Sequence, residues 1–372
     1  MPLRRRELLK SALILGSALK VGAASSTEPT GASAKQYKRF AVEEGFNIPE
    51  VVAETRKFLS TRAAEEPALA AMWSRFVPPE GGGPPIWAKQ LTDLGEGRIK
   101  VMDAYGISKQ LLLLSSPGVQ IFDAQQAMEL AALANDRLAS AIGTFPDRFA
   151  GLTTIAPQNP EAAALELERG VKKLGLKGAL INSHTRGQYL DQRKFWPIFE
   201  AAQALDVPIY LHPREVSGGP YVEYGLEGAI WGFAVETSLH ALRLIFSGVF
   251  DAFPKLRIVI GHMGEGIPFY MYRIDNRYLW EGGGGSRAGM TKLKRLPSEY
   301  FRDNFVITTS GMNWHAPLVM THSVLGADGI LFAVDYPFEE HAPAVAAMDS
   351  VPLSESDKEK IYHLNAARVF AM

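Results

Sequence analysis

The sequence contains no cysteine, which excludes disulfide bonds, thiolate metal sites and a cysteine nucleophile. It also lacks an excess of charge of either sign, because 39 basic residues stand against 40 acidic ones. Without a basic surface, neither nucleic acid nor an anionic membrane is expected as a partner. What the 372 residues do have is a hydrophobic fraction of 47%, enough to bury the core of one large domain or of two average ones.

A long hydrophobic run is missing too, and the best candidate for one lies at the N-terminus. The stretch RRRELLKSALILGSALKVGAASS places Arg5 and Arg6 before a short apolar segment that ends in small residues. This pattern resembles a twin-arginine export signal, with an amphipathic surface helix as the alternative. The apolar segment is too short to cross about 30 Å of hydrocarbon, so no stable membrane anchor is expected. We predict an export signal and spacer at 1–35, a folded domain at 36–372, and a periplasmic location.

From Arg39 onward, short aliphatic runs alternate with longer amphipathic segments. The longer segments repeat their apolar residues at spacings of three and four, as helices on the outside of a domain do. The short runs are apolar on both faces, which is typical of parallel strands covered on both sides. Eight runs predict an α/β fold, a (β/α)8 TIM-like barrel with an insertion at 46–108 after the first strand; a doubly wound open sheet is the alternative. The runs cover residues 39–43, 109–116, 149–156, 178–183, 207–212, 257–262, 305–310 and 330–335.

The chemistry of such a barrel lies at the C-terminal ends of its strands, so the last residue of each run is a candidate. Four of the runs end in Glu43, His212, His262 and Asp335. In a closed barrel these four side chains converge on one region. Carboxylate and imidazole ligands without sulfur suit Zn²⁺ or Mn²⁺ and leave positions open for water or substrate. The pattern therefore predicts one divalent metal ion at the mouth of the barrel.

Several motifs carry a resemblance to a known family. They are YLHPRE, ETSLHALRLIFSGVFDAFPKLRIVIGHMGEGIPF, YRIDNR and FAVDYPFE. With them the chain resembles, from about Arg39 to its end, the amidohydrolase-related decarboxylases that act on ortho-hydroxylated aromatic acids, such as 2,3- and 2,6-dihydroxybenzoate decarboxylases. The pair GHMGEGIPF and DYPFE favours decarboxylases over generic hydrolases.

The resemblance implies a role for individual residues of this chain. The implied metal ligands are Glu43 on the first strand, His212 on the fifth and Asp335 on the eighth. Asp335 is also the implied catalytic acid. His262 and Glu265 are the implied catalytic pair that supports it.

The family has a fourth ligand, and here this chain departs from the pattern. The first strand of the family reads Glu-x-His, whereas this chain has Gly45 where the histidine would stand. Glycine cannot bind a metal, and Glu44 points away from Glu43 in a regular strand. His315, after the seventh run, is an alternative that could reach over the site. We expect three protein ligands, a weakly bound ion, and an empty space at Gly45.

Three further residues are candidates for contacting the substrate. Arg273 is suited to pair with a carboxylate through two hydrogen bonds, although a surface pair with Asp275 is the alternative. Phe338 follows Asp335 at a spacing that lets its ring form a wall of the pocket. His184 directly follows the fourth run, beside the expected site.

The predicted function is non-oxidative decarboxylation, possible in both directions, of a small ortho-hydroxylated aromatic carboxylate. The metal stabilises the charge that develops on the ring and phenolic oxygen, and Asp335 delivers a proton to C1. The resemblance also implies a homo-oligomer, either a dimer or a tetramer. Two alternatives remain open. One is a metal-dependent hydrolase of a lactone or amide with Asp335 as base, and the other is a degenerate, non-catalytic relative, because of Gly45.

The export prediction can be tested by replacing Arg5 and Arg6 together with lysine. The variant should stay in the cytoplasm, because the twin-arginine route depends on this pair and carries proteins that are already folded. The measurement is the distribution of the protein between periplasmic and cytoplasmic fractions, with the native sequence as the control. An unchanged periplasmic fraction would contradict the prediction.

Overall fold

The computed structural model describes residues 37–76, 86–216, 220–284 and 291–372. All of them belong to one unit of the chain, Tyr37–Met372. The predicted export signal and spacer at 1–35 lie outside the described residues. Within the described ranges, no helix combines the length and the apolar character that crossing a membrane requires.

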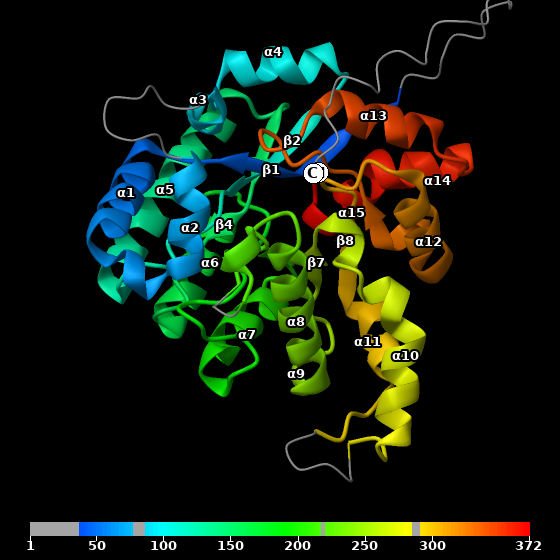
Figure 1. Cartoon of the computed structure of the whole chain (residues 1–372). Helices are drawn as coiled ribbons and strands as arrows, with labels where there is room; N and C mark the ends of the chain where they lie inside the picture. The colour runs from blue at the N-terminus through cyan, green and yellow to red at the C-terminus, as the bar shows by residue number, and fades with distance from the viewer. Residues whose placement is uncertain (1–36, 77–85, 217–219, 285–290) are drawn as a thin grey trace, which may run out of the picture. The chain divides into compact units, whose positions relative to one another are not determined.

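Parallel strands stand in the centre and helices surround them (Figure 1). The strands pair in chain order, as β1-β2-β3 and as β4-β5-β6-β7-β8-β9. Nearly every residue in them is buried, which explains the continuous apolar runs. The strands are β1 (Phe40–Phe46), β2 (Lys109–Leu114), β3 (Phe149–Gly151), β4 (Thr153–Thr154), β5 (Ala179–Asn182), β6 (Ile209–His212), β7 (Ile258–Ile260), β8 (Phe305–Thr308) and β9 (Ile330–Leu331).

The nine strands correspond to the eight predicted runs, because Leu152 divides the third run into β3 and β4. Its backbone N–H still donates to Leu112 of β2, with an N to O distance of 2.9 Å. The next N–H, of Thr153, turns to the other neighbour and donates to Gly178 at 2.8 Å. The ring closes where the N–H of Val42 donates to the carbonyl of Phe332 at 3.1 Å. The predicted (β/α)8 barrel is thus confirmed.

The predicted insertion between β1 and β2 is helical. It contains α1 (Pro49–Arg62), the 3-10 turn η1 (Ala63–Glu65), α2 (Pro67–Phe76), α3 (Ile86–Thr92) and α4 (Glu96–Ala104). The remaining helices are α5 (Ala124–Thr144), α6 (Pro160–Lys172), α7 (Trp196–Ala204), α8 (Gly232–Phe246), α9 (Val249–Ala252), α10 (Ile267–Trp280), α11 (Pro297–Asn304), α12 (His315–Leu325), α13 (His341–Ser350), α14 (Glu355–Glu359) and α15 (Asn365–Phe370). Short turns are η2 (Arg193–Phe195), η3 (Val222–Tyr224), η4 (His262–Gly264), η5 (Ala327–Gly329) and the π-helical η6 (Lys360–Leu364).

A buried polar cluster joins the end of β5 to α8. The hydroxyl of Ser183 donates to Glu236 Oε1 at 3.2 Å and lies 3.2 Å from His240 Nδ1. The backbone N–H of Leu190 donates to His240 Nε2 at 3.0 Å, so this nitrogen carries no proton. Burial, with a smaller effect of Arg243, lowers the pKa of His240 to about 3. The folded protein therefore holds a neutral imidazole here at all but strongly acidic pH.

This cluster predicts a loss of stability in mild acid. Below about pH 6.5, His240 binds a proton in the unfolded chain but stays neutral in the folded protein. The free energy of unfolding therefore falls as the pH falls. His240 alone should contribute a slope of up to about 1.4 kcal/mol per pH unit between its two pKa values. In denaturant titrations from pH 7.5 to 5, His240→Gln should show a shallower slope than the native protein. Equal slopes would contradict this assignment.

Candidate active site

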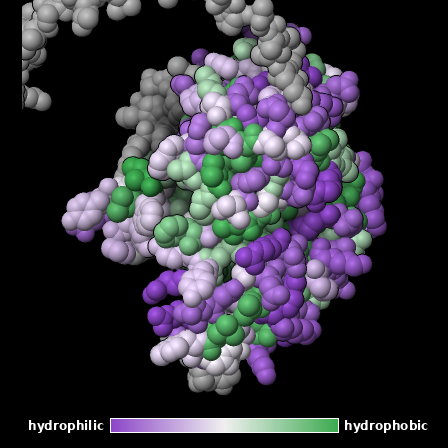
Figure 2. Space-filling model, turned by 90° about the vertical axis from the view of Figure 1, so that its right-hand side faces the viewer, coloured by the Kyte–Doolittle hydropathy of each residue, from purple (hydrophilic) through white to green (hydrophobic). Residues whose placement is uncertain are grey.

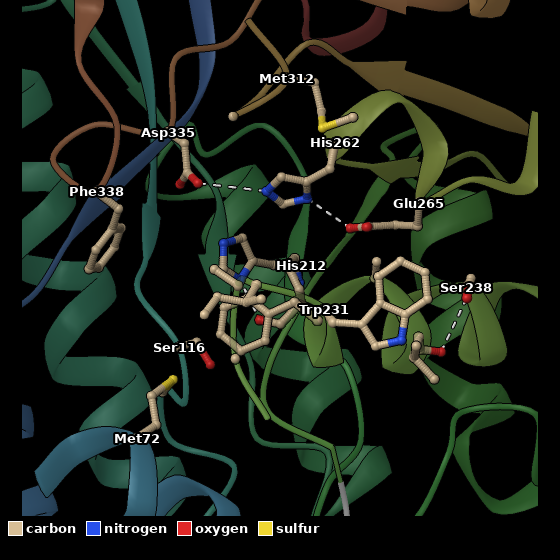
Figure 3. A pocket seen from close by; sticks show the side chains of 18 of the residues that line it. Met72, Ser116, His212, Trp231, Ser238, His262, Glu265, Met312, Asp335 and Phe338 are labelled. Atoms are coloured by element: carbon tan, nitrogen blue, oxygen red, sulfur yellow. Dashed lines mark hydrogen bonds and ion pairs between the residues drawn. The ribbon is translucent and has the colours of Figure 1, made fainter. Parts of the chain in front are cut away.

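The C-terminal ends of the strands open into a pocket of about 1090 Å³. The insertion contributes one wall, and α8, α10 and the loop before α8 contribute another. Figure 3 shows His262 between Asp335 and Glu265, with His212 facing the same space and with Phe338 and Trp231 on opposite sides. The residues that line the pocket include Met72, Trp73, Leu91, His212, Trp231, His262, Glu265, Arg273, Asp335 and Phe338.

Glu43 lies on β1 with its side chain completely buried inside the barrel. Its Oε2 accepts hydrogen bonds from the hydroxyls of Tyr210 and Thr308, the latter at 2.5 Å. Its Oε1 has no hydrogen-bond partner among the described residues. Gly261 leaves the room for this oxygen, because a Cβ there would stand 2.6 Å from it. Burying a carboxylate oxygen without a hydrogen-bond donor is unfavourable in free energy. A positive charge next to Oε1 would compensate this cost.

His212 faces that oxygen from the end of β6. Its Nδ1 donates to the carbonyl of Pro213 at 2.8 Å, which leaves the lone pair on Nε2. Nε2 is 4.0 Å from Oε1 of Glu43. Burial lowers the pKa of His212 to about 4, so the imidazole is neutral at neutral pH. Two acceptor atoms therefore point at each other, and a cation between them would satisfy both.

Asp335, His262 and Glu265 form a chain of acidic and basic groups beside these acceptors. Oδ2 of Asp335 is 3.6 Å from His262 Nε2, and His262 Nδ1 is 2.7 Å from Glu265 Oε1. All three residues have a positive φ, at 80°, 50° and 52° respectively. Such angles are unfavourable for residues other than glycine and are characteristic of functional sites.

Burial and the charges of the neighbouring groups determine the protonation of Asp335, His262 and Glu265. Burial raises the pKa of Asp335 to about 7, although His262 opposes the rise. Burial alone would lower the pKa of His262, but the carboxylates of Glu265 and Glu43 outweigh it and raise this pKa well above its ordinary value. Near neutral pH the Asp335–His262 pair therefore keeps a proton available to the pocket.

Gly45 does not leave the empty space that the sequence suggested, and this expectation was wrong. A Cβ at Gly45 would lie 3.1 Å from Leu91 Cδ2 and 3.4 Å from Phe338 Cε2. Both neighbours line the pocket, so apolar side chains fill the region where an imidazole would begin. Glu44 points away from Glu43, as expected, and its carboxylate contacts the backbone of Val334 and Tyr336.

The other two histidines considered for the site have structural roles. His184 is buried, donates from Nε2 to the carbonyl of Glu215 at 3.1 Å, and accepts at Nδ1 from the N–H of Gly187 at 3.1 Å. The expectation that His184 contacts the substrate was therefore wrong, because both of its ring nitrogens form hydrogen bonds with the backbone. His315 begins α12 and contacts the carbonyl of Ala347 at 3.0 Å, so it does not serve as a fourth ligand here.

Arg273 and Phe338 lie where a substrate would meet them. Phe338 is on the pocket wall with 51% of its surface exposed. Arg273 lines the pocket from α10, and among the described residues it forms no ion pair with Asp275. Asp275 instead accepts a hydrogen bond from the N–H of Ser298 at 2.9 Å. The surface pair considered as the alternative for Arg273 is therefore absent from the described part of the chain.

Sequence reasoning missed the groups that hold Glu43. Tyr210 stands two residues before His212 on β6, and residues two apart on a strand share a face, so its position in YLHPRE was an available signal. Burial and the Glu43 carboxylate raise the pKa of Tyr210 well above its ordinary value, so its hydroxyl remains a donor. Thr308 and Gly261 gave no comparable signal, because their importance depends on side chains from other strands.

The donor set fits a divalent cation. Glu43 offers an unpaired oxygen, His212 a free nitrogen lone pair, and Asp335 a carboxylate at the same pocket. Within the described ranges, no three histidine or carboxylate side chains already stand in an arrangement that could hold an ion. Asp335 also faces His262, with its Oδ2 3.6 Å from His262 Nε2.

Comparison with known proteins agrees with this chemistry. Residues 71–372 match the amidohydrolase family. A gamma-resorcylate decarboxylase from Polaromonas sp. is 41% identical over 308 residues, which cover 80% of this chain and 93% of the relative.

Two solved structures have the same fold over nearly their whole length. The 5-carboxyvanillate decarboxylase from Sphingomonas paucimobilis has a TM-score of 0.85 at 41% identity, covering 90% of this chain and 99% of that one. The enzyme of that name from Novosphingobium aromaticivorans, solved with manganese and 4-hydroxy-3-methoxy-5-nitrobenzoic acid, has a TM-score of 0.87 at 39% identity, covering 92% and 98%. The chain therefore belongs to the amidohydrolase family and is similar within it to decarboxylases of hydroxylated benzoates.

Proposed function

We propose that this protein is a carboxy-lyase that removes CO₂, without oxidation, from an ortho-hydroxylated aromatic carboxylic acid at a divalent metal site. The observation that carries the proposal is the Asp335–His262–Glu265 chain, a proton source, directly beside the facing acceptors of Glu43 and His212. The names of the relatives point to hydroxylated benzoates as the substrate class and favour a lyase over a lactone or amide hydrolase.

The metal would be held by Glu43, His212 and Asp335. Two of these three ligands are anionic oxygens, which favours Mn²⁺ over Zn²⁺, and solved relatives contain manganese. When bound, the ion supplies positive charge for the phenolic oxygen and the substrate carboxylate. His212 is prepared for this role by its Nδ1 hydrogen bond to Pro213, which fixes the tautomer.

Asp335 and His262 then transfer one proton to the substrate in each turnover. Asp335 donates its proton to C1 of the ring, and C1 becomes tetrahedral. The bond between C1 and the carboxylate breaks, its electron pair restores the aromatic ring, and neutral CO₂ leaves. His262, held by Glu265 at 2.7 Å, returns a proton to Asp335 for the next turnover. One proton is consumed for each CO₂ released.

Arg273 and Phe338 are the proposed substrate contacts. The ring of Phe338 and the side chain of Leu91 give the aromatic substrate an apolar surface beside Asp335. Arg273 approaches the pocket from α10 and offers a planar cation to an anionic or polar ring substituent.

We also infer a homo-oligomer. Figure 2 shows hydrophobic side chains gathered in patches among hydrophilic ones on one face of the molecule. Helix α10 exposes five large apolar side chains, and exposed apolar patches commonly mark protein contacts. They are Phe269, Tyr270, Tyr272, Leu279 and Trp280.

Replacing Asp335 by asparagine tests the proposed acid. Turnover should fall by about 10²–10⁴-fold, because the variant loses the donated proton and an anionic ligand. The measurement is CO₂ release from 2,6-dihydroxybenzoate and 5-carboxyvanillate, with Mn²⁺ supplied and with a metal-depleted sample for comparison. Glu265→Gln should lose less turnover than Asp335→Asn, because Glu265 acts only through its contact with His262. Near-native turnover in Asp335→Asn, or no dependence on metal in the native protein, would contradict the mechanism.

The surroundings of Gly45 predict how a fourth ligand could be restored. Gly45→His alone should bind Mn²⁺ no better than the native protein, because Leu91 and Phe338 occupy the space its ring needs. With Leu91→Ala added, affinity should rise roughly tenfold, or about 1.4 kcal/mol. Competition with a chelator measures this, and Leu91→Ala alone is the control. A double variant that binds no better than this control would show that position 45 does not face the ion.

A further inference from the structure

Glu44 is a completely buried carboxylate for which the proposed reaction has no use. It follows Glu43 on β1, where the pairing of β1 with β2 shifts register between Ala41 and Glu44. Such bulges commonly re-aim side chains next to active sites. Glu43 points into the barrel, and Glu44 points toward the segment that follows β9.

The contacts of Glu44 enclose Asp335. Its Oε1 accepts from the backbone N–H of Val334 at 3.0 Å, and its Oε2 accepts from that of Tyr336 at 3.3 Å. These are the residues immediately before and after Asp335. The strand adds a third bond to the same segment, because the N–H of Gly45 donates to the carbonyl of Tyr336 at 2.7 Å.

Asp335 needs such a restraint because its φ is 80°. A residue other than glycine enters the left-handed region only when its surroundings impose it. Beyond β9, which ends at Leu331, no ladder of a regular strand holds Asp335 in the described structure. The position of Tyr336 restrains the backbone of Asp335 before it, and Glu44 and Gly45 hold Tyr336 at its N–H and at its carbonyl, respectively.

The buried carboxyl group of Glu44 has further partners, and burial raises its pKa to about 8. Gln110 Nε2 donates to Glu44 Oε2 at 3.2 Å, and Gln110 Oε1 accepts from Arg98 at 3.3 Å. Arg98, also buried, donates to the carbonyl of Gly45 at 2.7 Å. A guanidinium thus lies one side chain away from the carboxylate and is fixed to the same strand. The arrangement is a built acceptor and not an accidental contact.

We propose that Glu44 is a positioning residue that holds Asp335 in the conformation from which it donates its proton and reaches the metal. The proposal rests on the role of Asp335 proposed above. Glu44 touches neither substrate nor metal in this account. Its effect is transmitted entirely through the two backbone amides on either side of Asp335.

Two variants of Glu44 test the proposal in different ways. Glu44→Gln keeps the length of the side chain but can accept from only one of the two amides. Glu44→Asp keeps the carboxyl group but is too short to reach both amides. In each, kcat should fall between about tenfold and 10²-fold, as expected for a displaced catalytic group, while KM stays within about twofold. Affinity for Mn²⁺, measured without substrate by competition with a chelator, should fall as well.

The matched control is Glu236→Gln. Glu236 is a buried carboxylate that also accepts two hydrogen bonds, from Ser183 and Tyr189, but neither it nor these partners line the pocket. It should lose thermal stability to a degree comparable with Glu44→Gln, while its kcat and Mn²⁺ affinity stay close to native. Equal losses of kcat in the two variants would identify the role of Glu44 as structural and overturn the proposal.

Hydrogen exchange supplies a readout that does not depend on turnover. In the native protein the amides of Val334 and Tyr336 should be protected, and Glu44→Gln should speed their exchange by roughly tenfold or more. Unprotected amides in the native protein would overturn the proposal even if neither variant folds. Native kcat, Mn²⁺ affinity and exchange in Glu44→Gln would overturn it as well. Failure of the proposed reaction would appear separately, as an active Asp335→Asn.

Discussion

The half-satisfied carboxylate of Glu43 is the constraint around which the site is built. Two hydroxyls, from Tyr210 and Thr308, donate to one of its oxygens, and the other has no partner in the described structure. Burying an anionic oxygen in this way costs several kcal/mol unless a positive charge compensates it. Gly261 keeps the approach to that oxygen open, and His212 turns a lone pair toward it. The barrel has thus placed negative potential at one point, which a divalent ion can neutralise.

The first strand serves both sides of that point. The side chain of Glu43 points into the barrel. The side chain of Glu44, the next residue, accepts hydrogen bonds from the backbone on both sides of Asp335. A ligand and the proposed proton donor are therefore fixed by adjacent residues of a single strand. The spacing between them therefore depends on the strand and on the bulge in it. This explains why a strained conformation at Asp335 can be maintained beside a cavity.

Sequence reasoning located the barrel and most of the site for one physical reason. In a parallel barrel all C-terminal strand ends meet on one face, so the ends of apolar runs identify Glu43, His212 and His262 without knowledge of contacts. The same reasoning failed wherever the outcome depended on a distant partner. His184 directly follows a run, but a carbonyl from the loop after β6 and an amide of its own turn form hydrogen bonds with its two ring nitrogens. At Gly45 the surroundings come from α3 and from the loop after β9, and no local pattern predicts either.

The pocket is lined by two parts of the chain, the barrel and the insertion after β1. The groups proposed to bind metal and move the proton come from the barrel, whereas Met72, Trp73 and Leu91 come from the insertion after β1. A buried ion pair joins the two parts, because Arg214, two residues after His212, donates to Glu66 at the start of α2 with a distance of 2.8 Å. Arg214 also donates to the buried carboxylate of Glu215 at 2.9 Å, so one guanidinium holds carboxylates from both parts. The wall formed by the insertion is therefore held next to the strand that carries the proposed metal ligand His212.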